Sequence, residues 1–213
     1  MTSRSRYWRR RYYEIFSLFY DRFIQLNARG DESGTREFLA DSAALPHVDA
    51  PLGLDICRGT GAAMQAQVTC HPRGTFVGYD FSRGMLHAAR RIRSNGRITL
   101  AQGNAAALPF ADDTFHTVCC SHSLYELKGA DRSRALSEMK RVVRRVGVVL
   151  IMEHEAPTGT LGAFMFRLRL KAMGSADAKE FVEPNLAPYR KIIPSVSLRH
   201  TPTGRIKLIC CRK

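Results

Sequence analysis

The sequence predicts one α/β domain with a mostly parallel sheet that helices cover on both faces. From residue 51 onward, short apolar runs alternate with amphipathic stretches of helical period. The runs are apolar throughout rather than at every second position, which is typical of strands buried on both faces. The chain has 213 residues, 45% of them hydrophobic, so it is long enough to bury a core of its own.

Each element has its own signal. The run 51–57 reads as a buried strand that closes on Gly59-Thr60-Gly61, and a helix is expected over 62–69. Further strands are expected over 75–80, 97–101, 114–120, 146–153 and 205–211. Further helices are expected over 82–93, with Ser82 as N-cap, and over 131–143, where Leu136, Met139, Val142 and Val143 form the apolar face. Ligands of such sheets bind beyond the carboxyl ends of the strands, so the residues that end each strand are expected to carry function.

Two appendages flank this core. Apolar residues at helical spacing predict helices within 7–45, and residues 161–173 predict a basic amphipathic helix. We expect a basic, helical N-terminal cap over 1–45 and a main domain over 46–213, which together form one structural unit.

The charge and the cysteines limit the partners. Lys and Arg outnumber Asp and Glu by 33 to 19, and residues 1–13 hold five Arg and no acid. This excess favours an anionic membrane surface, nucleic acid or another acidic partner, although a solvated basic face accounts for it equally well. The six cysteines have no metal-binding spacing, and we expect no metal site. Each vicinal pair, 119–120 and 210–211, is expected to place one thiol in the core and one outside.

No apolar run reaches the 18 residues that a membrane span requires. We therefore expect a cytoplasmic protein that is at most peripheral to a membrane.

The most informative segment joins the first strand to its helix. Glycines at 59 and 61 let the backbone approach a ligand closely, and Asp80, which ends the next strand, can accept both hydroxyls of a ribose. This predicts a nucleoside-containing cofactor, either a dinucleotide or S-adenosylmethionine. Met64 occupies the place of the third glycine of a dinucleotide fingerprint, and Asp55 suits a positively charged amine, so S-adenosylmethionine is favoured.

Five segments resemble the class I S-adenosylmethionine-dependent methyltransferases. LDICRGTG resembles motif I, FVGYDFSRGMLHAAR the second motif, QGNAAALPFADDTFHTV the adenine-binding segment, and EMKRVVRRVGVVLIME the approach to strand five. FSLFYDRF is similar to the entry helix of the ubiquinone/menaquinone C-methyltransferase family. The resemblance covers residues 14–155 and implies a Rossmann-like, seven-stranded, mostly parallel sheet with an N-terminal helical cap.

The resemblance also implies a set of residues that bind S-adenosylmethionine. By position these are, for the methionine part, Asp55, Cys57, Gly59 and Gly61; for the ribose, Asp80; for the adenine, Phe81, Met85, Asn104 and Ala105; near the sulfonium, Ser121; and from the cap, Tyr20. Departures from the family pattern are Cys57 for the first loop glycine, Asn104 and His116 for aspartates, and residues 144–147 for a K-P-G-G turn. Cys57 matters if the turn needs a positive φ there.

The function expected from the resemblance is methyl transfer to a small, apolar or lipid-like acceptor such as a quinone precursor, a phenol or a lipid headgroup. His122 and Tyr125 are the first candidates for the catalytic base, and Glu126, Glu153 and His154 follow. The N-P-P-Y-like tetrapeptide of amino-methylating nucleic-acid enzymes is replaced by Cys-Ser-His-Ser, which disfavours that class. The alternatives are a non-catalytic protein of this fold that binds an anionic partner, and a nucleic-acid methyltransferase.

Overall fold

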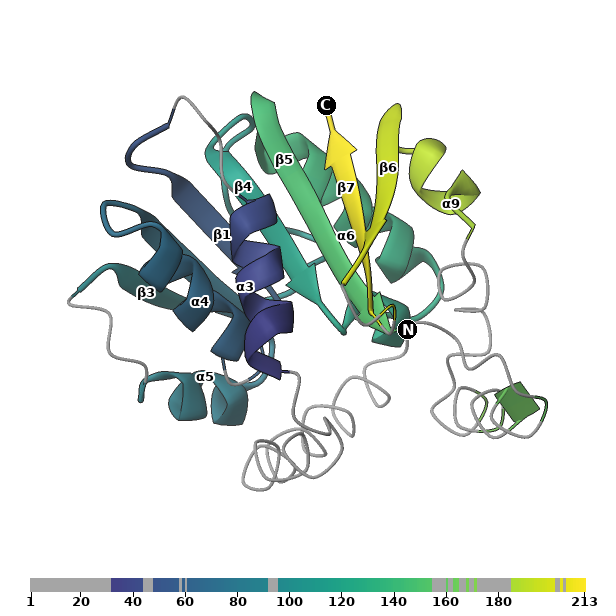
Figure 1. Cartoon of the computed structure of the whole chain (residues 1–213), viewed down its shortest axis with the longest axis horizontal. Helices are drawn as coiled ribbons and strands as arrows, with labels where there is room; N and C mark the ends of the chain where they lie inside the picture. Colours follow the sequence, from purple (N-terminus) through teal and green to yellow (C-terminus); the bar gives the residue numbers. More distant parts are fainter. Residues whose placement is uncertain are drawn as a thin grey trace.

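The apolar runs of the sequence become the strands of one sheet. The structure is a computed structural model, and it describes residues 32–43, 48–57, 59, 61–91, 96–154, 185–201, 204 and 206–213, with single positions at 160, 163, 164, 168 and 171. Within these residues, seven strands lie in the order β3-β2-β1-β4-β5-β7-β6 (Figure 1). They are β1 (Leu52–Ile56), β2 (Thr75–Asp80), β3 (Ile98–Gln102), β4 (Phe115–Ser121), β5 (Val143–His154), β6 (Ser195–His200) and β7 (Ile206–Arg212). The seven-stranded α/β fold is confirmed.

Strands β1 to β5 are parallel, whereas β7 runs antiparallel to both of its neighbours, β5 and β6. The predicted strands agree with the observed ones to within a residue or two, apart from two differences. Strand β6 was not predicted, and β5 starts three residues early. Helix α6 (Ala130–Val142) ends directly against β5, so residues 144–147 are extended and form no separate turn.

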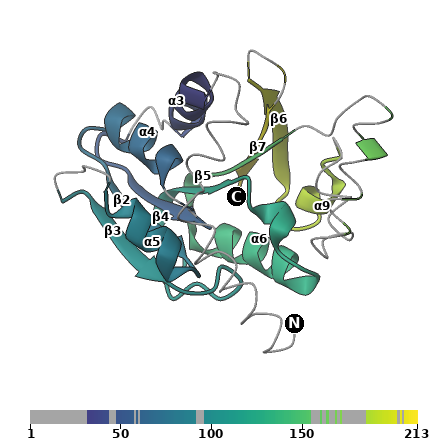
Figure 2. The same ribbon diagram turned by 90° about the horizontal axis from the view of Figure 1, so that it is seen from below.

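Helices cover both faces of the sheet. Helix α3 (Glu32–Ser42) packs beside α4 (Ala62–Cys70), and α6 lies on the opposite face (Figure 2). The remaining described helices are α5 (Arg83–Ala89), the single 3-10 turn η1 (Leu124–Glu126) and α9 (Ala187–Arg190). Of the predicted cap, α3 is observed, while residues 1–31 and most of the predicted helix 161–173 lie outside the described residues. None of the described helices has the length and hydropathy needed to cross a membrane.

The two larger apolar clusters fill the space on either side of the sheet, and a third, of Met64, Val68 and Phe76, lies between α4 and β2. Of the first two, the larger one, on the α6 face, includes Phe115, Leu136 and Ile151, and the smaller one, under α3, includes Leu39 and Leu150. Burial of this apolar surface is the main force that holds helices and sheet together.

The two thiols of the pair Cys119–Cys120 are both fully buried, so the prediction that one lies outside was wrong for this pair. Alternation does send them to opposite faces, Cys119 into the smaller cluster and Cys120 into the larger. Both are buried because β4 is a central strand with packed side chains on each face. In the second pair Cys211 is buried and Cys210 is half-buried, which is closer to the prediction.

Candidate cofactor and acceptor site

The candidate site lies at the carboxyl ends of the parallel strands. Strand β1 lies between β2 and β4, and the chain reverses its direction across the sheet at β1 (Figure 1). In open α/β sheets a ligand binds at such a switch point. The topology therefore brings together residues at the carboxyl ends of four different strands, namely Cys57, Asp80, Asn104 and Ser121.

The loop after β1 has the left-handed backbone that the sequence suggested. The φ angles are 51° at Cys57, 58° at Gly59 and 89° at Gly61, which is the N-cap of α4. Glycine adopts such angles freely, whereas a residue with a Cβ is strained by about 1–2 kcal/mol. The turn does require a positive φ at Cys57, so this departure from the family pattern is a strained position.

Asp80 joins the glycine loop to the end of β2. The residue is 5% exposed. Oδ2 accepts a hydrogen bond from the Gly59 N–H at 3.0 Å, and Oδ1 accepts one from the Ser82 N–H at 2.8 Å. The Ser82 hydroxyl in turn accepts from the Met85 N–H at 3.3 Å and caps α5, as predicted. An ionised carboxylate offers about four lone-pair sites, which is the acceptor chemistry that ribose hydroxyls require.

The candidate adenine side is built on β2 and β3. Tyr79 is buried, its ring packs edge-on against Phe110 with centroids 5.7 Å apart, and burial raises the pKa of its hydroxyl. A Cβ on Gly103 would lie 1.7 Å from the Tyr79 Oη, so only glycine fits this close approach. Asn104 Oδ1 accepts from the Ala106 N–H at 3.0 Å, which turns the chain after β3.

Phe81, Met85 and Ala105 lie on the same side of the site. Phe81 is half-buried, whereas Met85 and Ala105 are buried and belong to the core. The Phe81 carbonyl accepts a hydrogen bond from Gln102 Nε2 at 2.9 Å, which ties the ends of β2 and β3 together. Because Met85 and Ala105 are buried, they can support a bound ligand only from within the core.

The candidate acceptor side follows β4. The Ser121 hydroxyl is buried and has no hydrogen-bond partner within the described part of the chain. His122 has a φ of 53°, and its N–H donates to the Met152 carbonyl at 2.7 Å. The Ser123 hydroxyl lies between the carbonyls of Cys57 and Ser121, at 3.2 and 3.0 Å, and so connects this segment to the glycine loop. His122 and Tyr125 are both half-buried.

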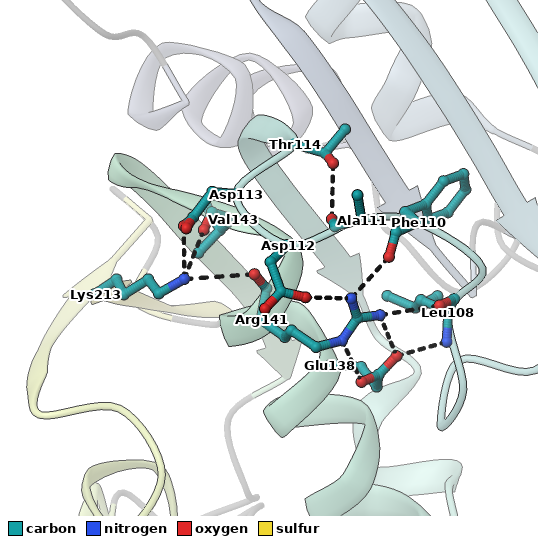
Figure 3. Close-up of polar contacts among 10 residues, drawn as sticks. All are labelled: Leu108, Phe110, Ala111, Asp112, Asp113, Thr114, Glu138, Arg141, Val143 and Lys213. Atoms are coloured by element: carbon teal, nitrogen blue, oxygen red, sulfur yellow. Dashed lines mark hydrogen bonds and ion pairs between the residues drawn. The ribbon is translucent and has the colours of Figure 1, made fainter.

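An arginine on α6 holds the segment that leads from the adenine side into β4. Arg141 donates to the carbonyls of Leu108 and Phe110 at 3.0 and 2.7 Å, and it pairs with Glu138 and Asp112 at 2.7 and 2.8 Å (Figure 3). Glu138 also accepts from the Leu108 N–H, and the pKa of its carboxyl is lowered, mainly by its hydrogen bond to the guanidinium. The backbone of this segment is therefore held through the Leu108 N–H and through the carbonyls of Leu108 and Phe110.

The buried thiols of Cys119 and Cys120 are poor nucleophiles. The pKa of Cys120 is raised well above its usual value, first by its contact with the Cys57 thiol and then by burial. Burial likewise raises the pKa of Cys119. Because the thiolate is the reactive form, neither residue supports covalent chemistry at neutral pH.

Several functional candidates were missed or lie out of reach. Tyr20 and the His154 side chain lie outside the described residues. Sequence reasoning missed the links made by Ser123 and Tyr79, and their position next to strand ends was the available signal. It also missed Arg132, a buried arginine on α6, for which the sequence offers no signal. Among the described residues, no group of three or more His, Cys, Asp or Glu is placed to hold a metal ion.

Comparison with known proteins identifies the family. A model described as "Methyltransferase domain" matches residues 54–147. The demethylmenaquinone methyltransferase of Bacillus licheniformis is 31% identical over 182 residues, which cover 81% of this chain and 77% of that protein. The chain belongs to the class I S-adenosylmethionine-dependent methyltransferases of the UbiE-like type.

Two further matches define the extent of the similarity. The ubiquinone/menaquinone biosynthesis C-methyltransferase UbiE of Geobacter sulfurreducens is 36% identical over 113 residues, which span 51% of this methyltransferase chain but only 43% of that protein. An O-methyltransferase family protein from Burkholderia thailandensis shares the fold with a TM-score of 0.65 at 17% identity, over 84% of this chain and 56% of that one.

The residues present fit S-adenosylmethionine, the cofactor of this methyltransferase family. The left-handed backbones of Cys57, Gly59 and Gly61 suit close approach of a ligand, and Asp80, which ends β2, accepts the Gly59 N–H. The buried Ser121 hydroxyl stands at the switch point with unused hydrogen-bonding capacity. These three features come from three strands and converge at one edge of the sheet.

Proposed function

We propose that this protein transfers a methyl group from S-adenosylmethionine to a small, lipid-like acceptor of the quinone-precursor class. The observation that carries the proposal is the Asp80 carboxylate, which is buried at the end of β2 and hydrogen-bonded to the glycine loop at Gly59. The relatives named for demethylmenaquinone and ubiquinone/menaquinone methylation support the acceptor class.

In this proposal each part of the site has one task. Asp80 binds the ribose, the loop 57–61 receives the methionine part, and the segment around Asn104 lies beside the adenine. When bound, the cofactor supplies the electrophilic methyl group. Methyl transfer is an in-line displacement, so the remaining tasks are to orient the acceptor and to remove its proton.

We assign proton removal to His122, with Tyr125 as a wall or hydrogen-bonding partner of the acceptor. Both residues follow β4 directly, at the edge of the sheet where the cofactor residues meet. A histidine titrates near neutral pH, which suits a general base. An acidic hydroxyl on the acceptor, as in a quinol, provides the proton that such a base removes.

Calorimetric titration with S-adenosylmethionine tests the cofactor part. Asp80→Ala removes the hydrogen bonds to both ribose hydroxyls, and at about 1.5 kcal/mol each this weakens binding about 150-fold. Asp80→Asn keeps one acceptor oxygen and has an intermediate effect. Asp49→Asn, an exposed carboxylate beside Arg73, is the control and leaves affinity unchanged. Wild-type protein that is folded but does not bind the cofactor would refute the proposal.

Methyl transfer to a short-chain demethylmenaquinol, a simple phenol and phospholipid vesicles tests the acceptor part. The quinol is expected to be methylated and the other two are not. His122→Asn keeps a residue that tolerates positive φ, so the backbone at 122 is retained. It is expected to lower kcat by about a hundredfold or more without changing the Kd of the cofactor. An unchanged kcat would remove His122 from the mechanism.

A further inference from the structure

The segment Ser121–Leu127, which we call the post-β4 segment, has an irregular backbone whose polar groups need partners. It combines a φ of 53° at His122 with the single 3-10 turn η1. The N–H groups of Glu126 and Leu127 bond within the turn, while the Leu124 N–H lacks such a partner because it begins the turn. Buried backbone groups are almost always paired, so the conformation of this segment depends on side chains beneath it.

Glu153 binds backbone N–H groups of the post-β4 segment. It lies on β5, its side chain is 2% exposed, and its Oε1 accepts the hydrogen bond of the Leu124 N–H at 3.0 Å. The Tyr125 amide also interacts with this carboxyl. The carboxyl therefore takes the place of the strand or helix partner that the start of η1 lacks.

Arg132 binds the carbonyl groups of the same segment. Its guanidinium is carried by α6, the residue is 2% exposed, and it donates to the carbonyls of Leu124, Tyr125 and Leu127. Two buried ionisable side chains from different elements thus bind the two sides of one turn. Burying such polar groups is costly, and their hydrogen bonds to the turn offset part of that cost, although Glu153 Oε2 has no hydrogen-bond partner among the described residues.

We propose that Glu153 and Arg132 are positioning residues for methyl transfer, because they hold the post-β4 segment in the shape that places His122 and Tyr125 at the acceptor side. This inference rests on the proposed function. Neither residue needs to touch the acceptor, since each acts through backbone atoms of residues 124–127. Sequence reasoning placed Glu153 among candidate bases, whereas its contact with the Leu124 amide gives it a supporting role.

The surroundings of Glu153 are consistent with a carboxyl that serves as a neutral hydrogen-bonding group. Burial is the largest influence and raises its pKa to about 8, so it is mostly protonated at pH 7. The titratable or charged groups that interact with it come from five elements: Glu126 from η1, Lys207 from β7, Tyr189 from α9, Cys120 from β4, and Arg132 from α6 through the shared turn.

The test compares Glu153→Leu, which removes the acceptor for the Leu124 N–H, with Glu153→Gln, which keeps it. Asp131→Asn is the matched control, because Asp131 is a half-buried carboxylate at the start of α6 that pairs with Arg134 instead. For each variant we measure the Kd of S-adenosylmethionine, kcat and KM with a short-chain demethylmenaquinol at pH 7, and hydrogen exchange of the peptide that covers 121–127.

Glu153→Leu is expected to lower kcat by about a hundredfold through misplacement of the reacting groups, with faster exchange in 121–127 and an unchanged cofactor Kd. Glu153→Gln is expected to restore kcat to near the wild-type value, and Asp131→Asn to match wild type throughout. A purely structural role would instead lower the melting temperature and leave the kcat of the folded protein unchanged. If Glu153→Leu does not fold, Arg132→Lys, which keeps the charge and loses the fork of donors, is measured in the same way.

The two proposals fail in different ways. A folded Glu153→Leu with wild-type kcat, or a Glu153→Gln that does not restore it, would overturn the positioning role while the proposed function stands. A wild-type protein that binds the cofactor and methylates none of the acceptors would overturn the proposed acceptor class and the positioning role with it.

Discussion

The buried carboxyl of Glu153 makes the stability of the protein fall as pH rises, and Glu153→Gln should remove this fall. In the folded protein the carboxyl holds its proton up to about pH 8, whereas in the unfolded chain it ionises near the ordinary value of 4.5. Between these two values the folded state binds more protons than the unfolded state. The stability that this difference provides is fully present below pH 4.5 and is lost as pH rises through 8.

The magnitude follows from the two pKa values. Each pH unit inside the window changes the free energy of unfolding by about 1.4 kcal/mol, so Glu153 alone lowers stability by up to about 4 kcal/mol between pH 5 and pH 8. Other groups titrate in the same range; the pKa of His116, for example, is lowered by burial, which makes its contribution rise with pH. The difference between wild type and Glu153→Gln cancels these shared contributions.

Urea unfolding at pH 5, 6, 7 and 8, followed by circular dichroism, provides the assay. Relative to wild type, Glu153→Gln is expected to become more stable with each step from pH 5 to pH 8. The m-value should stay constant, since the surface exposed on unfolding does not change. Two parallel stability curves, with a constant difference across this range, would refute the reasoning.

Three further changes test other parts of the site. Cys57→Gly relieves the left-handed strain of about 1 kcal/mol but adds freedom to the unfolded chain, so urea unfolding should show a net gain of about 0.5 kcal/mol; a loss above 1 kcal/mol would contradict the strain. Arg141→Ala removes the bonds to the Leu108 and Phe110 carbonyls and should cost about 2 kcal/mol, while the exposed control Arg134→Ala should cost less than about 0.5 kcal/mol. Equal losses in these two variants would show that the clamp adds nothing. Gly103→Ala forces Tyr79 out of its place and should weaken S-adenosylmethionine binding about tenfold or more in a calorimetric titration, and unchanged affinity would place the adenine elsewhere.

The parallel part of the fold was predictable because its inner strands are largely buried on both faces. Such strands are continuous apolar runs, and the helices between them show a clear period. Strand β6, one of the two edge strands, was missed because most of its residues are polar and exposed, namely Ser195, Ser197, Arg199 and His200. Its extended form comes from antiparallel pairing with β7. The residues themselves carry little signal for it.

The candidate site was predictable where a short motif fixes both residue type and backbone. Gly59, Gly61 and Asp80 lie together at the switch point, as expected. The φ angle of Cys57 could not be predicted from the sequence. A cysteine neither requires nor forbids a positive φ, so the geometry of the surrounding turn determines the angle. The contacts through which a residue outside the site holds the backbone of the site were not predictable from the sequence. Arg132 looks like any arginine on the solvent face of a helix, and only the three-dimensional structure shows that it reaches three carbonyls.

The adjacent thiols of Cys119 and Cys120 provide two reporters within a single dipeptide. One lies under α3 and the other faces α6, so each reacts with an alkylating reagent only when its own layer separates from the sheet. In variants that keep one of the two, the rates of labelling under native conditions would give the opening free energy of each layer at the same point along the chain. A difference between the rates would reveal which half of the molecule loosens first.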